Sequence, residues 1–195
     1  MVKTLPKVPQ LDISQSYPRT VKLRGKSLEL RQMGPKDRDA VVAFARSLPE
    51  EDLLFLRMDI TQPAIVDEWI AAIEQGRRFT VLAQRDGALA GYGSLNCQNL
   101  TWSRHLGEIR MIVDASSRGS GLGALLAQEV FSVARDSGLT KIVAQMARQQ
   151  EGARRVFHKL GFTVESMLAD WVIDRDGQTH DLVIMSYDVT GLTDS

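Results

Sequence analysis

Cysteine is almost absent from this chain, since its 195 residues include only one, Cys97. A single cysteine cannot form an internal disulfide, so a disulfide-stabilised framework is excluded and a reducing cytoplasm is the expected location. The sequence also lacks an apolar run of 18 residues, and we therefore expect no membrane-spanning helix. Residues 1–6 lack the apolar core of a signal peptide.

Charge of one sign is not in excess either. The chain has 24 lysines and arginines against 24 aspartates and glutamates, and its sequence pI is about 6.8. A chain with this balance does not bind nucleic acid through bulk positive charge. Three scattered histidines and one cysteine do not have the ligand spacing of a metal site. We therefore expect no nucleic-acid partner, no membrane partner and no metal ion.

Length and composition indicate one globular domain, with 44% hydrophobic and 25% charged residues. Residues 1–18 are rich in proline and polar residues and show no periodicity, so they are predicted to form an extended arm. The domain itself is predicted to span residues 19–190, and residues 191–195 are predicted to form a short tail.

Strand and helix patterns alternate along this domain. Apolar alternation predicts strands, and an apolar stripe with a period near 3.6 predicts helices. The expected strands are 20–23, 27–31, 79–84, 89–95, 106–113, 141–146, 162–168 and 181–189, with a short apolar segment at 171–173. The expected helices are 35–47, one that starts at 49, 63–75, 122–137 and one that starts near 150. This order predicts the α+β class with a mixed sheet.

The most distinctive segment is glycine-rich and joins a strand to a helix. It follows the apolar strand that ends at residue 113 and consists of Arg118, Gly119, Ser120, Gly121, Leu122 and Gly123. Small residues at such a turn let the backbone approach phosphate groups, and the helix N-terminus offers N–H donors. The segment therefore predicts a pyrophosphate site for a nucleotide-like cofactor.

Three cofactor patterns can be compared with this segment. A P-loop is excluded because no Lys-Ser or Lys-Thr pair follows the glycines. The dinucleotide pattern Gly-x-Gly-x-x-Gly/Ala fits Gly119, Gly121 and Ala124, but the next strand lacks the acidic residue that holds the ribose. The third pattern, Arg/Gln-x-x-Gly-x-Gly/Ala, is met by Arg118, Gly121 and Gly123.

This third pattern resembles motif A of the GCN5-related N-acetyltransferases, the GNAT superfamily, which binds the pyrophosphate of acetyl-CoA. A later helix of that family reads Asn-x-x-Ala-x-x-Leu-Tyr-x-x-x-Gly-Phe, and residues 150–162 are similar to it: Ala153, Val156, Gly161 and Phe162 fall in register. The resemblance covers about residues 27–189. It implies a GNAT fold, in which a mixed, mostly antiparallel sheet is flanked by helices and splayed at its central strand. It also implies acetyl-CoA as cosubstrate.

For the cofactor, the resemblance implies contacts from the central strand, from the glycine-rich turn and from the later helix. The residues at these positions are Met111, Ile112, Val113, Arg118, Gly119, Ser120, Gly121, Leu122, Gly123, Ala124, Gln150 and Phe157. A backbone N–H near Ile112 or Val113 is expected to stabilise the oxyanion. Gln150 and Phe157 depart from the usual Asn and Tyr, and Phe157 cannot protonate the leaving thiolate as the tyrosine would.

A general base is expected at Glu108. Acetyl transfer needs a neutral amine, and deprotonating a lysine at pH 7 costs roughly 4–5 kcal/mol. In the protein-lysine branch of the family a glutamate on the matching strand is the base, and Glu108 stands at that position. The alternative is a structural ion pair with Arg110, two residues along the same strand face. His105 is a weaker candidate for gating or proton relay.

The acceptor is expected to be an amine, and a protein lysine is the preferred hypothesis. Residues 49–57 and 104–110 resemble bacterial GNATs that acetylate lysines of acyl-CoA synthetases. Glu50, Glu51 and Asp52 could attract a basic protein surface, although they would equally favour a helix N-terminus. The alternatives are a small-molecule amine acetyltransferase and a non-catalytic acyl-CoA-binding regulatory domain. Both a monomer and a homodimer remain open.

Overall fold

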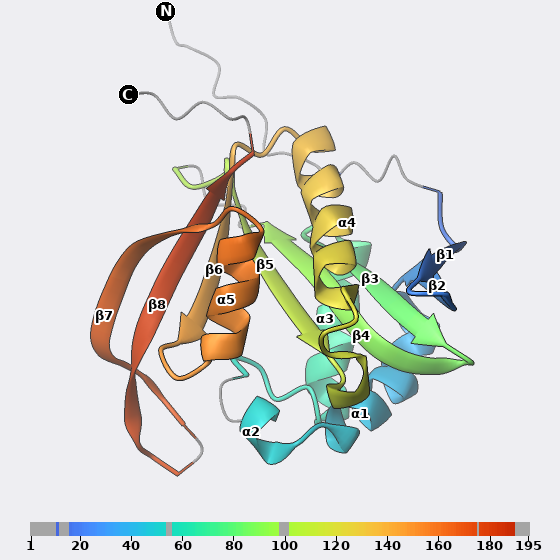
Figure 1. The fold of residues 1–195 in the computed structure, drawn as a ribbon, viewed down its shortest axis with the longest axis horizontal. Coiled ribbons are helices and arrows are strands. Elements are labelled where there is room, and N and C mark those ends of the chain that lie inside the picture. Colours follow the sequence, from blue (N-terminus) through green and yellow to red (C-terminus); the bar gives the residue numbers. More distant parts are fainter. Residues whose placement is uncertain (1–10, 12–15, 54–55, 98–101, 175, 190–195) are drawn as a thin grey trace, which may run out of the picture.

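A computed structural model describes residue 11 and residues 16–53, 56–97, 102–174 and 176–189 (Figure 1). Its strands are β1 (Arg19–Leu23), β2 (Lys26–Gln32), β3 (Arg78–Arg85), β4 (Ala88–Cys97), β5 (Leu106–Val113), β6 (Lys141–Ala147), β7 (Thr163–Ile173) and β8 (Thr179–Asp188). Its α-helices are α1 (Arg38–Ser47), α2 (Glu50–Leu53), α3 (Pro63–Glu74), α4 (Leu122–Asp136) and α5 (Glu151–Lys159). Short 3-10 helices cover Pro35–Asp37 and Ala115–Ser117. No helix in the described part of the chain is long and apolar enough to cross a membrane.

The strands form one eight-stranded sheet in the order β1-β2-β3-β4-β5-β6-β8-β7. Every neighbouring pair is antiparallel except β5 and β6, which are parallel. Two hairpins turn through residue pairs with positive φ, Arg24 with Gly25 and Asp86 with Gly87, as tight two-residue turns between twisted strands require. The predicted mixed, mostly antiparallel sheet is therefore confirmed.

The central strands β5 and β6 separate soon after they meet. Their parallel pairing covers three residue pairs, which end at Glu108 opposite Val143. From Ile109 to Val113, β5 continues to pair with β4, but its other edge has no strand partner. The unpaired edge leaves backbone polar groups of β5 available to a ligand.

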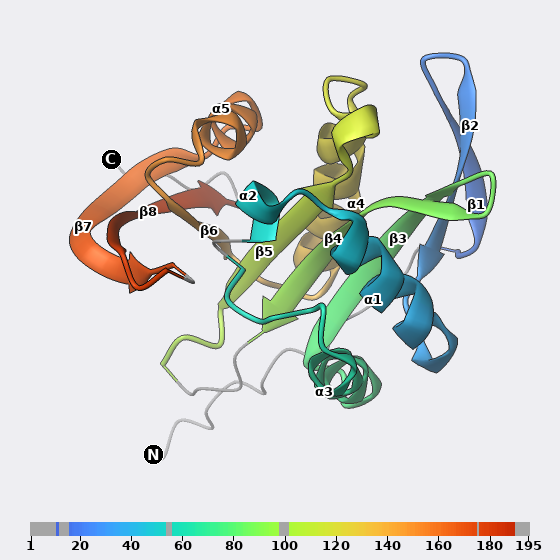
Figure 2. The same ribbon diagram turned by 90° about the horizontal axis from the view of Figure 1, so that it is seen from below.

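Helices cover both faces of the sheet and create two apolar cores (Figure 2). On one face α1 and α3 pack over β3 and β4, where Val41, Phe44, Val66, Trp69 and Leu82 are buried. On the other face α4 packs over β3, β4 and β5, and its buried side chains include Leu126, Val130 and Val133. The amphipathic patterns predicted for these helices are therefore confirmed.

The C-terminal strands differ from the prediction. The apolar segments at 162–168 and 171–173, predicted as separate, are joined in one long strand, β7, which begins at Thr163. Its pairing with β8 shifts register between Leu168 and Val172, where Asp170 has a φ of 51°. A bulge lets a strand bend sharply without ending, and residue-type patterns do not reveal it.

The end of the predicted arm is fixed to the domain. The Tyr17 hydroxyl donates a 2.7 Å hydrogen bond to Glu129 of α4, and Arg19 forms an ion pair with the same carboxylate. Glu129 is only 3% exposed, so these two partners satisfy a buried charge. The predicted tail at 191–195 and most of the arm lie outside the described residues.

Candidate active site

A cavity of about 1070 Å³ runs along the unpaired edge of β5. Its lining includes all but one of the residues that the sequence predicted for the site: Glu108, Met111, Ile112, Val113, Arg118, Gly119, Gly121, Leu122, Gly123, Ala124, Gln150 and Phe157. The exception is Ser120, whose hydroxyl donates to the Ser117 carbonyl oxygen at 2.6 Å. The cavity thus connects the glycine-rich turn at one end with Glu108 at the other.

The glycine-rich turn has the geometry of an anion cradle. Gly121 is the N-cap of α4 and has a φ of 97°, which side-chain-bearing residues rarely adopt. Ser120 Oγ accepts from the Leu122 N–H at 3.3 Å. The N–H groups of Gly121, Gly123 and Ala124 have no acceptor among the described residues. These donors at a helix N-terminus fit a pyrophosphate group.

Arg118 has a carboxylate partner from a distant helix. Its guanidinium is ion-paired with Asp52 of α2, which also lines the cavity. Of the three acids at the start of α2, Asp52 is therefore neutralised within the domain, whereas Glu50 and Glu51 are exposed. The sequence placed Arg118 at the cofactor site but gave no sign of this pair.

Helix α5 and the residue before it, Gln150, contribute the opposite wall of the cavity. Gln150 Oε1 accepts from the Ala147 N–H at 2.9 Å and so connects the end of β6 to the start of α5. The Phe157 ring is 7% exposed and packs edge-on against Phe162, with ring centroids 4.9 Å apart. Within the cavity Phe157 therefore presents an apolar surface.

Beyond the glycine-rich turn, two rows of polar residues cross the sheet, and all of them except Thr80 line the cavity. Arg78 of β3 pairs with Asn96 of β4, which pairs with Glu108 of β5. The next row is Thr80, Ser94 and Arg110. Residues directly opposite on neighbouring strands share a face of the sheet, so all six side chains lie on the face that α1 and α3 cover elsewhere.

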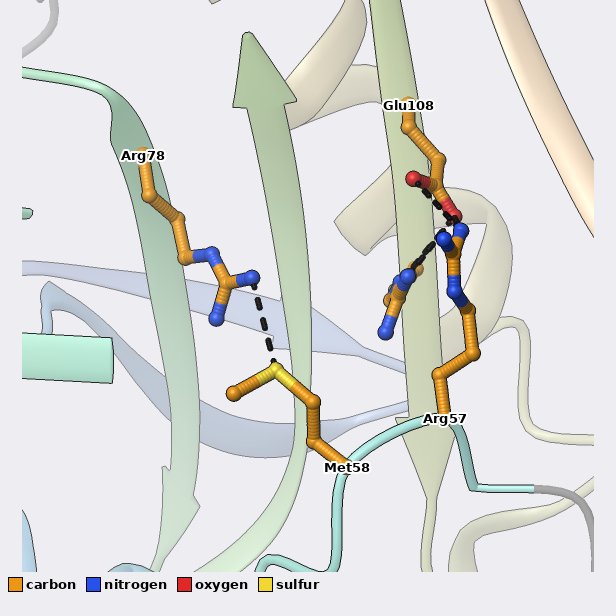
Figure 3. Close-up of polar contacts among 5 residues, drawn as sticks. Arg57, Met58, Arg78 and Glu108 are labelled. Atoms are coloured by element: carbon orange, nitrogen blue, oxygen red, sulfur yellow. Dashed lines mark hydrogen bonds and ion pairs between the residues drawn. The ribbon is translucent and has the colours of Figure 1, made fainter. Parts of the chain in front are cut away.

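Glu108 is only 8% exposed and is held by two arginines (Figure 3). Arg57, from the segment between α2 and α3, donates through Nη1 to Oε1 at 3.1 Å and to Oε2 at 3.2 Å. Arg110 donates through Nε and Nη2 to Oε1, at 3.2 and 2.8 Å. The structural ion pair with Arg110 therefore exists. It leaves Oε2 with a single contact and with spare capacity to accept a proton.

Arg78 differs from Arg57 and Arg110 because it forms no ion pair with Glu108. Its Nη2 lies 3.8 Å from Met58 Sδ (Figure 3) and its guanidinium carbon lies 5.4 Å from the centre of the Trp69 ring. Burial lowers the pKa of Arg78, and the neighbouring Arg110 lowers it further. Among the described residues Arg78 has no carboxylate partner.

Other residues singled out in the sequence lie elsewhere. Trp102 is 85% exposed, His105 and His158 are exposed, and none of the three lines the cavity. Cys97 is buried, and burial raises the pKa of its thiol to about 12. A neutral buried thiol is a poor nucleophile.

Sequence reasoning missed Arg78, Met58 and Trp69, which line the cavity with Glu108. They come from β3, from the segment before α3 and from α3. No local motif marks them, because the register of β3 and β4 places Arg78 beside Asn96 and Glu108. The available signal was an arginine directly before the predicted strand 79–84.

Comparisons with known proteins identify the family to which this chain belongs. A profile described as "Acetyltransferase (GNAT) family" matches residues 39–162. YwnH of Bacillus subtilis, described as a candidate phosphinothricin acetyltransferase, is 24% identical over 84% of this chain and 100% of its own length.

Solved structures share the fold. YncA of Salmonella typhimurium, an acetyltransferase candidate solved with its cofactor acetyl-CoA, has a TM-score of 0.72 at 21% identity, over 83% of this chain and 94% of its own. A ribosomal-protein-alanine N-acetyltransferase of Brucella melitensis has a TM-score of 0.72 at 19% identity, over 82% of this chain and 98% of its own. The family profile spans most of the domain, and the chain belongs to the acetyltransferase (GNAT) family.

Proposed function

We propose that this protein transfers an acetyl group from acetyl-CoA to an amine by direct attack, with both substrates bound together. The observation that carries the proposal is the single cavity, which joins the glycine-rich turn to the buried carboxylate of Glu108. A phosphate cradle and a proton acceptor in one cavity are the two elements that this reaction requires. When bound, acetyl-CoA supplies the activated acetyl thioester.

At the cofactor end, the N–H groups of Gly121, Gly123 and Ala124 bind the pyrophosphate, and Arg118 pairs with it after leaving Asp52. Along the unpaired edge of β5, backbone groups of Met111 and Val113 hold the pantetheine arm. A backbone N–H of the same edge stabilises negative charge on the acetyl carbonyl oxygen. Support for these roles comes from the free backbone donors and from the separation of β5 and β6.

At the acceptor end, Glu108 removes the proton that the amine loses as it forms its new bond to the acetyl carbon. Oε2 is the better acceptor, because Oε1 already receives three donor contacts and Oε2 only one. Phe157 has no proton to give to the departing sulfur, so solvent supplies it. Arg57 and Arg110 keep the carboxylate in place on the cavity floor.

The acceptor that the cavity supports best is a small amine. Glu108 is nearly buried, and Arg57 and Met58 lie over the polar rows, so the amine must enter a walled space. A protein lysine is the second candidate. It is favoured by Glu50 and Glu51, which are exposed at the start of α2, and by Glu51 lining the cavity.

The test is the release of free thiol from acetyl-CoA by the purified protein, measured with panels of small amines and with candidate proteins. Mass spectrometry of the products identifies the acetylated nitrogen. Acetylation of a small amine, with no protein labelled in a cell lysate, supports the first candidate. Labelling of protein lysines that weakens after reversing Glu50 and Glu51 to lysine supports the second. Tight acetyl-CoA binding without transfer to any acceptor would instead indicate a regulatory domain.

A further inference from the structure

The acceptor end of the cavity carries more positive than negative charge. Three guanidinium groups, from Arg57, Arg78 and Arg110, surround the one carboxylate of Glu108. Glu108 accepts from Arg57 and Arg110 together, so its charge is already shared between two cations. The third guanidinium, on Arg78, forms no ion pair with Glu108, although, besides the effect of burial, Arg110 lowers and Glu108 raises the pKa of Arg78 at longer range.

Arg78 lines the cavity and is half-buried, unlike a surface arginine. It starts β3, and its head group lies over the Trp69 ring and beside Met58. Its Nε is buried and has no hydrogen-bond partner. A desolvated guanidinium without an anionic partner is unfavourable, and burial accordingly lowers the pKa of Arg78.

An anion bound at Arg78 would remove this penalty. The guanidinium presents a planar set of donors that matches the oxygens of a carboxylate or of another oxyacid. Asn96, the strand neighbour of both Arg78 and Glu108, lies between them with an amide that can also donate. The cavity floor thus places an anion-binding group and a proton acceptor in one row.

We propose that the acceptor is an amine that carries an anionic oxyacid group, which Arg78 binds while the amine lies at Glu108. This inference rests on the proposed acetyltransferase function and narrows its acceptor to amino-acid-like molecules. Arg78 and Glu108 are two strands apart, so their backbones are separated by roughly 10 Å. Both side chains extend into the cavity between them, so a short chain between amine and acid spans the gap. Polyamines and lysine-rich peptides would add positive charge to a site that already has an excess.

The experiment compares amines that differ only in the acid group: β-alanine against propylamine, and an α-amino acid series against the corresponding amides. We expect kcat/KM to be about 10- to 100-fold higher for the acids, which is the range of one charge-assisted contact. Arg78→Gln should lower kcat/KM for the acids towards the value for the neutral amines and so remove this preference. Arg78→Lys should restore part of it. The matched control is Arg77→Gln, which removes the exposed neighbouring guanidinium and should change nothing.

A binding measurement separates this inference from the proposed function. Calorimetric titration of the CoA-bound protein with succinate should show binding that Arg78→Gln weakens at least tenfold and that Arg77→Gln does not. Unchanged acetyl-CoA affinity in both variants shows that they are folded. If neutral amines are acetylated as well as acids, or if Arg78→Gln affects both alike, the anion site is wrong and the acetyltransferase function stands. If acetyl-CoA itself does not bind, the proposed function fails first.

Discussion

Arg118 of the glycine-rich turn is ion-paired with Asp52 of α2, 66 residues earlier in the chain. The guanidinium that we assign to the pyrophosphate is therefore engaged by a carboxylate of the same protein. Cofactor binding and this internal pair compete for one cation, so the strength of the pair sets part of the cofactor affinity.

Removing the competing carboxylate should tighten cofactor binding. We expect Asp52→Asn to lower the acetyl-CoA dissociation constant by up to about fivefold, because a partly exposed ion pair contributes at most about 1 kcal/mol. Calorimetry measures the change. Glu50→Gln, on the same short helix but exposed, is the control and should leave the affinity unaltered. Weaker binding in Asp52→Asn would mean that the pair positions Arg118 for the cofactor.

A side chain at Gly121 should block the cofactor. Gly121 and Gly138 both have positive φ, 97° and 72°, so alanine at either position should destabilise the fold by about 1–2 kcal/mol. Only Gly121 lines the cavity. We expect Gly121→Ala to weaken acetyl-CoA binding more than tenfold and Gly138→Ala to leave it intact. Equal affinities in the two folded variants would contradict the assignment of the turn.

Glu108→Gln should reduce turnover by roughly 10²–10⁴-fold at pH 7, because the amide keeps the shape but accepts no proton. The acetyl-CoA dissociation constant should change little. The deficit should shrink as the pH rises towards the pKa of the amine, since more acceptor is then already neutral. Glu29→Gln, on the exposed face of β2, is the control. A deficit that is constant with pH would assign Glu108 a structural role with Arg57 and Arg110.

Phe157→Tyr should leave turnover unchanged or raise it slightly, because the new hydroxyl faces the cavity and can give a proton to the leaving sulfur. Phe162→Tyr is the contrasting variant: Phe162 is 1% exposed, so its new hydroxyl would be buried and should cost about 1–3 kcal/mol. Steady-state kinetics and thermal unfolding distinguish the two. A large loss of turnover in Phe157→Tyr would show that the cavity cannot accommodate the extra oxygen.

Cys97 should resist alkylation in the folded protein. Burial raises the pKa of its thiol to about 12, so at pH 8 very little thiolate forms. Iodoacetamide labelling followed by mass spectrometry should show reaction only after unfolding. Above a pH of about 9 the unfolded chain ionises this thiol and the folded chain does not, so the free energy of unfolding should fall as the pH rises further. Rapid labelling of the native protein at pH 8 would contradict this.

The features that sequence reasoning predicted are those encoded by neighbouring residues. The strands on either side of Asp86 and Gly87, the strand that ends at Val113 and the turn around Gly121 each depend on a few consecutive side chains, and the structure contains all of them. Local backbone preference decides such segments, so a single sequence is enough to predict them.

The acceptor end was not predictable in this way. Arg57, Arg78 and Glu108 come from three separate parts of the chain, and only strand register and the path of the chain before α3 bring them together. Asp52 was interpreted as part of a surface acidic group, yet it pairs with Arg118. Long-range pairing between charged side chains leaves no periodic signal in the residues themselves.

The short contact between β5 and β6 has a mechanical consequence. Strands β1 to β5 form one half of the sheet, strands β6, β8 and β7 form the other, and three residue pairs connect the halves through their backbones. Across the same junction, Phe131 of α4 stacks on Tyr187 of β8 with ring centroids 5.0 Å apart. Because few backbone bonds join the halves there, their alignment depends on side chains from both halves that pack in one apolar core. The cavity is lined by residues of both β5 and β6, so a ligand bound there adds contacts where the backbone supplies few and should raise the free energy of unfolding of the whole domain.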